Sequence, residues 1–273
     1  MPVEPALGGQ IETCRWGDPA APDVLIALHA AASAPRAFTR LARELIRPGL
    51  QIVAPALNGY GDTMVEVAGD PVAQHGAVAE WVLERHRGSG QTYLFGHSMG
   101  GLVALNALAA RARVNRAALF EPIVLSCLDL SRADHRAGLA WDRDAVDGLN
   151  AAVASGSAED GLAGFIRAWN ETEWSTLPAE LREQLLGRAA SLAAETQTVS
   201  YYAFPLPSLQ RITVPVTVLH GAKSPPVSAL IAAELSERLD CACTQELADT
   251  GHMGPVFAAR AVAHCLRAWF NRP

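Results

Sequence analysis

Short apolar runs alternate with longer amphipathic runs along most of this 273-residue chain, and the alternation restricts the folds open to it. Short apolar stretches bounded by glycine, proline or polar residues predict buried strands at 24–28, 51–54, 92–95, 117–120 and 214–219. Apolar residues spaced three and four apart predict helices at 36–46, 71–87, 101–111, 227–239 and 258–270. This order predicts an α/β fold with a mainly parallel central sheet flanked by helices, whose ligands bind beyond the carboxyl ends of the strands.

The alternation stops between residues 123 and 211, which are helical by composition and rich in aromatic residues. This stretch has its own apolar residues and no low-complexity run, so we interpret it as an insertion between two core strands and not as a linker. We therefore expect one core formed by residues 1–122 and 212–273, interrupted by a helical insertion at 123–211.

Composition excludes several classes of function. Half of the residues are hydrophobic, which supplies a core, and 22 basic against 28 acidic residues give a net charge of −6, which predicts no nucleic-acid partner. No apolar run reaches the length of a membrane span, and residues 1–9 lack a secretion signal. Five scattered cysteines and eight histidines without metal-binding spacing predict reduced thiols, a cytoplasmic protein and no metal.

The segment at 92–101 reads T-Y-L-F-G-H-S-M-G-G and carries the strongest functional signal. An expected strand runs directly into a G-x-S-x-G pattern around Ser98 and then into an expected helix. Such a turn is strained, so the small residues Gly96 and Gly100 let the backbone pass closely while the Ser98 hydroxyl projects outward. The amide groups beside Ser98 then lie at a helix N-terminus, where they can stabilise an oxyanion.

A serine hydroxyl is a weak nucleophile unless a base lies within hydrogen-bond reach. The candidate base is His252, in a turn-rich loop at 249–254 that precedes the last expected helix. A loop histidine by itself more often has a solvated or structural role. The strand, turn and helix around Ser98 favour the catalytic interpretation here.

The chain resembles the α/β-hydrolase fold superfamily over nearly its whole length. The motifs that carry the resemblance are the serine turn at 96–101, Leu28-His29-Ala30-Ala31 after the first expected strand, a glycine-rich turn at 58–62, and Gly251-His252. The resemblance implies a serine hydrolase in which 123–211 forms the family's variable helical cap. It also implies that the backbone amides of Met99 and Ala31 form the oxyanion hole. His29, Trp141 and Trp169 are then candidates for substrate binding, although the aromatic residues of the insertion can equally form the cap's own core.

Two positions depart from the family pattern. Ala30 stands where the family usually has glycine in the oxyanion loop, and Ser224 stands where it usually has the acid of the catalytic triad. Ser224 cannot supply the charge that orients a catalytic histidine. Glu121 follows the strand after the serine-turn helix, a position from which some family members, among them haloalkane dehalogenases, supply a catalytic glutamate. The alternative acid is Asp249, whose more common role would be to brace its loop.

The resemblance and the residues together predict a cofactor-free hydrolase that cleaves carboxylic esters or related small acyl compounds through a Ser98-His252-Glu121 triad and an acyl-enzyme. Within the same fold, C–C bond hydrolases, enol-lactonases, thioesterases and perhydrolases remain alternatives. A non-catalytic ligand-binding homologue is the alternative from another class, because the usual acid is missing at Ser224. Replacement of Ser224 by alanine is expected to have little effect. The sequence carries no signal for oligomeric state.

Overall fold

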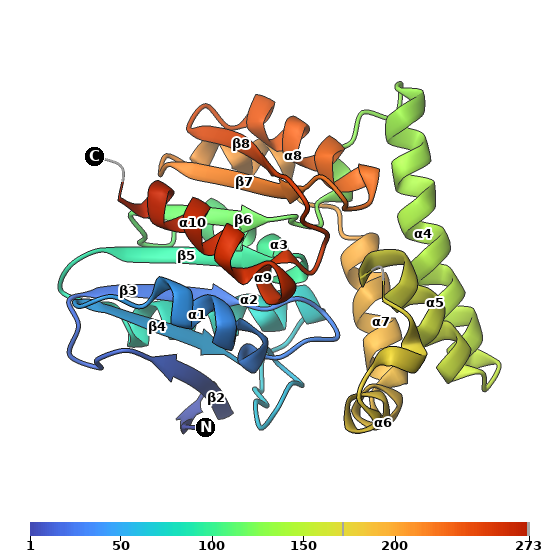
Figure 1. Ribbon diagram of the computed structural model, residues 1–273, viewed down its shortest axis with the longest axis horizontal. Coiled ribbons are helices and arrows are strands. Elements are labelled where there is room, and N and C mark those ends of the chain that lie inside the picture. Colours follow the sequence, from blue (N-terminus) through green and yellow to red (C-terminus); the bar gives the residue numbers. More distant parts are fainter. Residues whose placement is uncertain (171, 272–273) are drawn as a thin grey trace.

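The computed structural model describes residues 1–170 and 172–271. In these residues the strands form one sheet of eight, in the order β1-β2-β4-β3-β5-β6-β7-β8 (Figure 1). The strands are β1 (Val3–Ala6), β2 (Gly9–Trp16), β3 (Asp23–Leu28), β4 (Leu50–Pro55), β5 (Thr92–His97), β6 (Arg116–Phe120), β7 (Val216–Gly221) and β8 (Ala242–Leu247). Strand β2 is antiparallel to β1 and β4, and β3 to β8 are parallel. The predicted mainly parallel sheet is confirmed.

Helices cover both faces of the sheet (Figure 1). They are α1 (Thr39–Leu45), α2 (Pro71–Arg85), α3 (Met99–Ala109), α8 (Pro226–Arg238), the short α9 (Gly254–Phe257) and α10 (Ala259–Phe270). Apolar side chains of α1 and α10 share one core cluster with strand residues such as Leu25 and Phe95. Those of α2, α3 and α8 share the other cluster with Ile26 and Leu94. Successive strand residues thus point into opposite layers, as the pleat requires.

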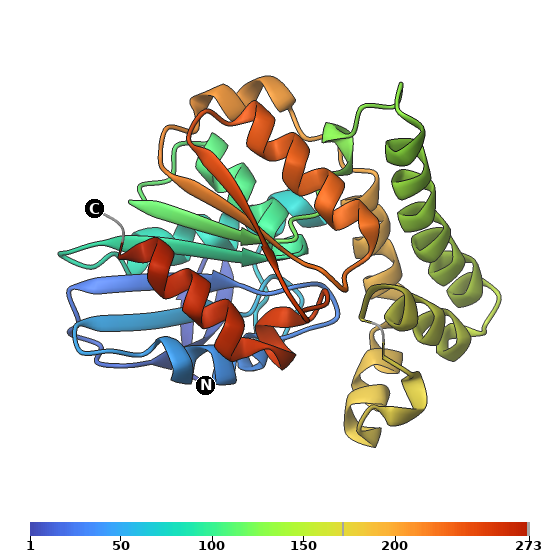
Figure 2. The same ribbon diagram turned by 45° about the horizontal axis from the view of Figure 1, so that its top comes forward.

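Four further helices lie beyond the carboxyl ends of the parallel strands (Figures 1 and 2). They are α4 (Ala133–Ala154), α5 (Ala158–Asn170), α6 (Ala179–Gly187) and α7 (Ala189–Ser200), and they connect β6 to β7. Single turns of 3-10 helix occur elsewhere, at η1 (Pro35–Phe38), η2 (Leu125–Cys127), η3 (Trp174–Thr176) and η4 (Leu206–Arg211). The α4–α7 segment has an apolar cluster of its own, which includes Leu149, Leu162 and Leu192. It therefore packs as a layer over the strand ends.

Three strands were missing from the sequence-based expectation. β1, β2 and β8 lie at or near the sheet edges, and most residues of β1 and β8 are at least partly exposed. Such strands need no continuous apolar run, which is the pattern that identified the central strands. The expected strand at 214–219 is β7, which begins at Val216, after Pro215, because proline has no backbone N–H to donate to a ladder.

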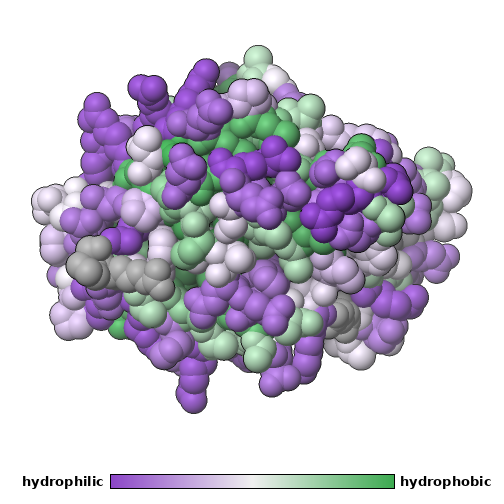
Figure 3. All heavy atoms as spheres, turned by 90° about the horizontal axis from the view of Figure 1, so that it is seen from above, coloured by the Kyte–Doolittle hydropathy of each residue, from purple (hydrophilic) through white to green (hydrophobic). Residues whose placement is uncertain are grey.

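No helix formed by the described residues combines the length and hydropathy needed to cross a bilayer. On the face shown in Figure 3, polar side chains are interspersed with apolar areas. Mixed surfaces of this kind are ordinary for folded proteins, because polar groups never cover the whole surface.

Candidate active site

The turn between β5 and α3 holds Ser98 in an unusual backbone conformation. Its φ is +57° and its ψ is −120°, a region that non-glycine residues rarely adopt. The Ser98 amide donates to the carbonyl of Phe120 at 2.9 Å, and the Ser98 carbonyl accepts from Gly101 and Leu102, so both sides of the turn are held. Backbone strain of this kind is concentrated at functional sites, where the surrounding structure enforces it.

Glycines on both sides of Ser98 make the turn possible. A Cβ on Gly96 would lie 2.4 Å from the carbonyl oxygen of Gly100. A Cβ on Gly100 would lie 2.3 Å from the carbonyl oxygen of Leu28. Both obstacles are backbone atoms, which cannot rotate away, so any larger residue at either position would push the strand, the turn and the following helix apart.

Three side chains from distant parts of the chain meet at this turn. The Ser98 hydroxyl lies 3.1 Å from Nε2 of His252, and Nδ1 of His252 lies 2.7 Å from Oε2 of Glu121. A neutral His252 protonated on Nδ1 accepts from Ser98 and donates to Glu121 in this geometry. The three residues are 7%, 4% and 1% exposed, so water competes little for these bonds.

Glu121 follows β6 at a φ of +47° and is held by four hydrogen-bond donors. Oε1 accepts from the Gly221 amide at 2.8 Å and from the Ser224 hydroxyl at 2.5 Å. Oε2 accepts from the Ser228 hydroxyl at 2.9 Å and from His252. Burial by itself would raise the pKa of the Glu121 carboxyl, but the bonds from His252, Ser224 and Gly221 outweigh burial and lower the pKa below its ordinary value. The carboxyl is therefore ionised at neutral pH.

The structure gives Ser224 a role that the sequence analysis did not expect, and it places Asp249 in the bracing role that the sequence analysis favoured. Ser224 occupies the position at which the family usually has its acid, and here it donates a hydrogen bond to the glutamate that reaches the site from β6. Replacement of Ser224 by alanine is therefore expected to lower kcat, although Ser224 carries no charge. Asp249 forms an ion pair with Lys223 at 3.1 Å, and its side chain is 88% exposed. This arrangement braces the loop before His252.

The loop after β3 borders the same cavity as Ser98. Met99 is the first residue of α3, whose first turn has N–H groups without intrahelical acceptors. Ala31 lies opposite in the β3 loop, and both residues border the same cavity as Ser98. The Ala32 amide donates to the hydroxyl of Tyr60 at 3.2 Å, and that hydroxyl donates to Glu195 of α7. The oxyanion loop is thereby tied to both the core and the α4–α7 segment.

His29 lies inside this loop and does not border the cavity. Its side chain has no exposed surface, Nδ1 donates to the Ala30 carbonyl at 2.8 Å, and Nε2 accepts from the Leu57 amide at 3.1 Å. Both ring nitrogens of His29 therefore hold backbone, and the structure does not bring His29 to the Ser98 cavity, so substrate contact by His29 stays a prediction. His29 fixes the shape of the loop beside Ala31.

The two tryptophans proposed for substrate binding have different positions. Trp169 borders the cavity, and the centre of its ring lies 4.7 Å from that of His252. Trp141 packs edge-to-face against Trp169, with 5.1 Å between the centres of the two rings. It lines a separate hollow between α4 and α5. Trp141 thus packs on Trp169 and does not border the Ser98 cavity, which agrees with a role in the core of the cap segment; substrate contact by Trp141 stays a prediction.

A family model for the alpha/beta hydrolase fold matches residues 23–259. The chain belongs to this family. The match includes the serine turn, Glu121 and His252, so the predicted α/β hydrolase is confirmed at the level of the family and the fold.

Individual relatives agree with this assignment. Lipase LipV of Mycobacterium tuberculosis is 29% identical over 271 residues, which cover 93% of this chain and 95% of the lipase. A putative lipase from Acinetobacter baumannii superposes with a TM-score of 0.73 at 19% identity, covering 98% of this chain and 90% of that one. An esterase from Exiguobacterium antarcticum superposes with a TM-score of 0.72 at 16% identity, covering 97% of each chain. The two structural likenesses concern the fold.

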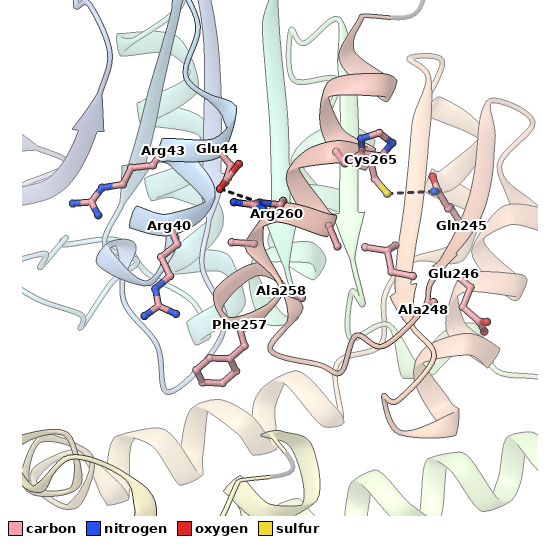
Figure 4. A pocket seen from close by; sticks show the side chains of 14 residues that line it. Arg40, Arg43, Glu44, Gln245, Glu246, Ala248, Phe257, Ala258, Arg260 and Cys265 are labelled. Carbon is pink, nitrogen blue, oxygen red and sulfur yellow. Dashed lines mark hydrogen bonds and ion pairs between the residues drawn. The ribbon is translucent and has the colours of Figure 1, made fainter.

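A larger hollow of this α/β hydrolase lies away from Ser98. It has a volume of about 920 Å³ and lies between α1, β8 and α10, where Arg40, Arg43 and the exposed Phe257 surround it (Figure 4). The cavity that Ser98 and His252 border has a volume of only about 40 Å³. We place the candidate site at the smaller cavity, because Ser98 and His252 border it and are joined to Glu121 by hydrogen bonds.

Sequence reasoning missed two polar residues of the hydrolase that the structure places at the site. Ser228 of α8 donates to Glu121, and Asp142 of α4 borders the cavity. Both lie inside amphipathic helices, where a single serine or aspartate is ordinary, so no local pattern distinguished them. Among the described residues, His, Cys, Asp and Glu side chains form no group of three suited to a metal ion.

The low pKa values of two buried histidines predict that acid lowers the free energy of unfolding of the hydrolase. Burial lowers the pKa of His29 and of His97 to about 3. Histidine in an unfolded chain titrates near pH 6.5, so between about pH 6.5 and 3 the unfolded state binds more protons than the folded state. Acidification from pH 7 to 5 should therefore reduce the free energy of unfolding by up to about 2 kcal/mol per histidine.

Urea unfolding at pH 7 and pH 5 tests this expectation. Burial raises the pKa of Asp142 to about 6, so this residue contributes in the opposite direction as the pH falls from about 6 to 4. His97→Asn should lose part of the pH dependence, whereas His264→Asn, at an exposed position of α10, should keep it. An unchanged pH dependence in His97→Asn would contradict the assignment.

Proposed function

We propose that this protein is an esterase-like serine hydrolase that cleaves small carboxylic esters through an acyl-enzyme on Ser98. The continuous contact from Glu121 through His252 to the Ser98 hydroxyl, at 2.7 and 3.1 Å, carries this proposal. Membership of the α/β-hydrolase family and the similarity to lipase LipV support the reaction class.

The proposed mechanism follows from these positions. Ser98 attacks the ester carbonyl while His252 Nε2 takes the serine proton, and the ionised Glu121 stabilises the imidazolium that forms. The amides of Met99 and Ala31 hold the oxyanion of the tetrahedral intermediate. His252 then protonates the departing alcohol, and a water molecule activated by the same histidine hydrolyses the acyl-serine.

We further propose that residues 123–211 act as a cap that encloses the reacting groups. The α4–α7 segment contributes Trp169 and Val146 to the cavity, and the core contributes Ser98 and His252. Exclusion of water by such a layer strengthens the electrostatic interactions that stabilise the transition state.

A fluorophosphonate probe followed by intact-mass measurement tests the proposal. The wild-type protein should gain one adduct, and Ser98→Ala should gain none, because the probe phosphonylates only a serine that a base activates, with loss of fluoride. Ser126→Ala serves as the control for an unrelated serine, and it should label like the wild type. Absence of an adduct on folded wild-type protein would favour the non-catalytic ligand-binding alternative.

A further inference from the structure

One acidic side chain in the cavity has no role in the proposed mechanism. Asp142, in the middle of α4, is 2% exposed and borders the cavity together with Ser98 and His252. Burial of a carboxyl group is costly unless donors compensate it, so its presence beside the nucleophile calls for a physical reason.

The hydrogen bonding of Asp142 differs from that of Glu121. Oδ2 of Asp142 accepts from the Ser200 hydroxyl at 2.5 Å, which ties α4 to the end of α7. Glu121 accepts hydrogen bonds from four donors. Within residues 1–170 and 172–271, the Asp142 carboxyl accepts a hydrogen bond from Ser200 alone. No lysine or arginine of these residues forms an ion pair with it. A carboxylate can accept about four hydrogen bonds, so Asp142 has capacity left over.

The surroundings of Asp142 determine what can use that capacity. The cavity wall from α4, α5 and α7 carries Val146, Phe165, Trp169 and Val199, together with the polar residues Asn170 and Thr196. The cavity volume of about 40 Å³ is far below the roughly 300 Å³ at which pockets for drug-sized ligands begin. A small group with one hydrogen-bond donor therefore fits this wall better than a long alkyl chain.

We propose that Asp142 is a specificity-determining residue that accepts a hydrogen bond from a hydroxyl group of the bound ester, so that small hydroxylated esters are the preferred substrates. The inference rests on the proposed esterase function and deepens it. A hydroxyl on the substrate would use the remaining acceptor capacity of Asp142, whereas an alkyl group at the same place would leave the buried carboxyl with the Ser200 hydrogen bond alone.

Pairs of esters that exchange a hydroxyl for a methyl group test this preference. Methyl 3-hydroxybutanoate and methyl 3-methylbutanoate differ on the acyl side, and 2-hydroxyethyl acetate and propyl acetate differ on the alcohol side. Acid release measured in a pH-stat gives kcat/KM for each. The wild-type enzyme should prefer the hydroxylated member of at least one pair by about ten-fold or more, the effect expected for a hydrogen bond to a charged group.

Variants of the α4 helix assign the preference to Asp142. Asp142→Leu should abolish it, and Asp142→Asn, whose amide oxygen still accepts, should retain a smaller preference. Asp144→Leu is the matched control, because this exposed aspartate lies on the same helix and should leave the ratio unchanged. Ser200→Ala keeps the carboxylate while removing its partner, so it should retain the preference.

The outcomes separate this inference from the proposed function. Ester hydrolysis that Ser98→Ala abolishes, but without a hydroxyl preference in either pair, would overturn only the role of Asp142. A preference that survives in folded Asp142→Leu, or one that Ser200→Ala removes as completely as Asp142→Leu does, would also overturn it. Undiminished hydrolysis by Ser98→Ala would instead refute the esterase mechanism itself.

Discussion

His252→Ala is expected to lower kcat for ester hydrolysis by about a million-fold, the loss typical when the base of a serine nucleophile is removed. Without the imidazole, the proton of the Ser98 hydroxyl has no acceptor at the 3.1 Å position that Nε2 occupies. The hydroxyl then has the reactivity of an ordinary alcohol, and the oxyanion amides and substrate binding supply what catalysis remains.

Steady-state kinetics on a short-chain ester, with active-site titration of the wild type, measure this loss. Ser98→Ala/His252→Ala should be no slower than either single variant, because the two residues act as one unit. His264→Ala provides a matched control at an exposed position of α10. Thermal unfolding should accompany the assay, since His252 also packs against Trp169. Retention of most activity in folded His252→Ala would exclude His252 as the base.

Glu121→Gln is expected to lower kcat by about ten thousand-fold through the tautomer of His252. The Gly221 amide can only donate, so the glutamine oxygen should stay at the position of Oε1 and its NH₂ group should face Ser228 and His252. The Ser228 hydroxyl can rotate to accept from this group. Nδ1 of His252 must then accept as well, which places its proton on Nε2, where it can no longer take the proton of Ser98.

Two further substitutions test the position of the acid. Ser224→Ala removes one of the four donors to Glu121 and should lower kcat by no more than about ten-fold, the upper end expected for loss of one hydrogen bond to a charged group that keeps its other partners. Asp249→Asn should leave kcat near the wild-type value, because this exposed side chain pairs with Lys223. If Asp249→Asn were as damaging as Glu121→Gln, the acid would belong to the loop and not to β6.

The central strands and the serine turn could be predicted because their signals are local. The runs around Leu25 and Phe95 are mainly apolar and buried, as strands covered on both faces require. Gly96 and Gly100 flank Ser98 at a spacing that one tight turn demands. The edge strands were missed in the sequence analysis because their exposed positions do not need apolar side chains.

The partners of individual side chains could not be predicted from the sequence in this way. His29 looked available to substrate because it follows β3, yet both of its ring nitrogens hold backbone inside the loop. Ser224 looked like a lost acid, yet its hydroxyl meets a glutamate 103 positions away in the chain. Asp142 gave no signal, because one acidic residue on an amphipathic helix is usually solvated.

The central strands, the helices that cover them, the strained turn at Ser98 and a short set of polar candidates follow from local sequence patterns. These depend on periodicity and on glycine, which act over a few residues. The three-dimensional structure was needed to show that Glu121, and not the loop residue Asp249, reaches His252, that Ser224 and Ser228 hold that glutamate, and that Asp142 borders the cavity. Those relations depend on how β6, β7, α4 and α8 pack, and packing joins residues more than a hundred positions apart for which no local pattern exists.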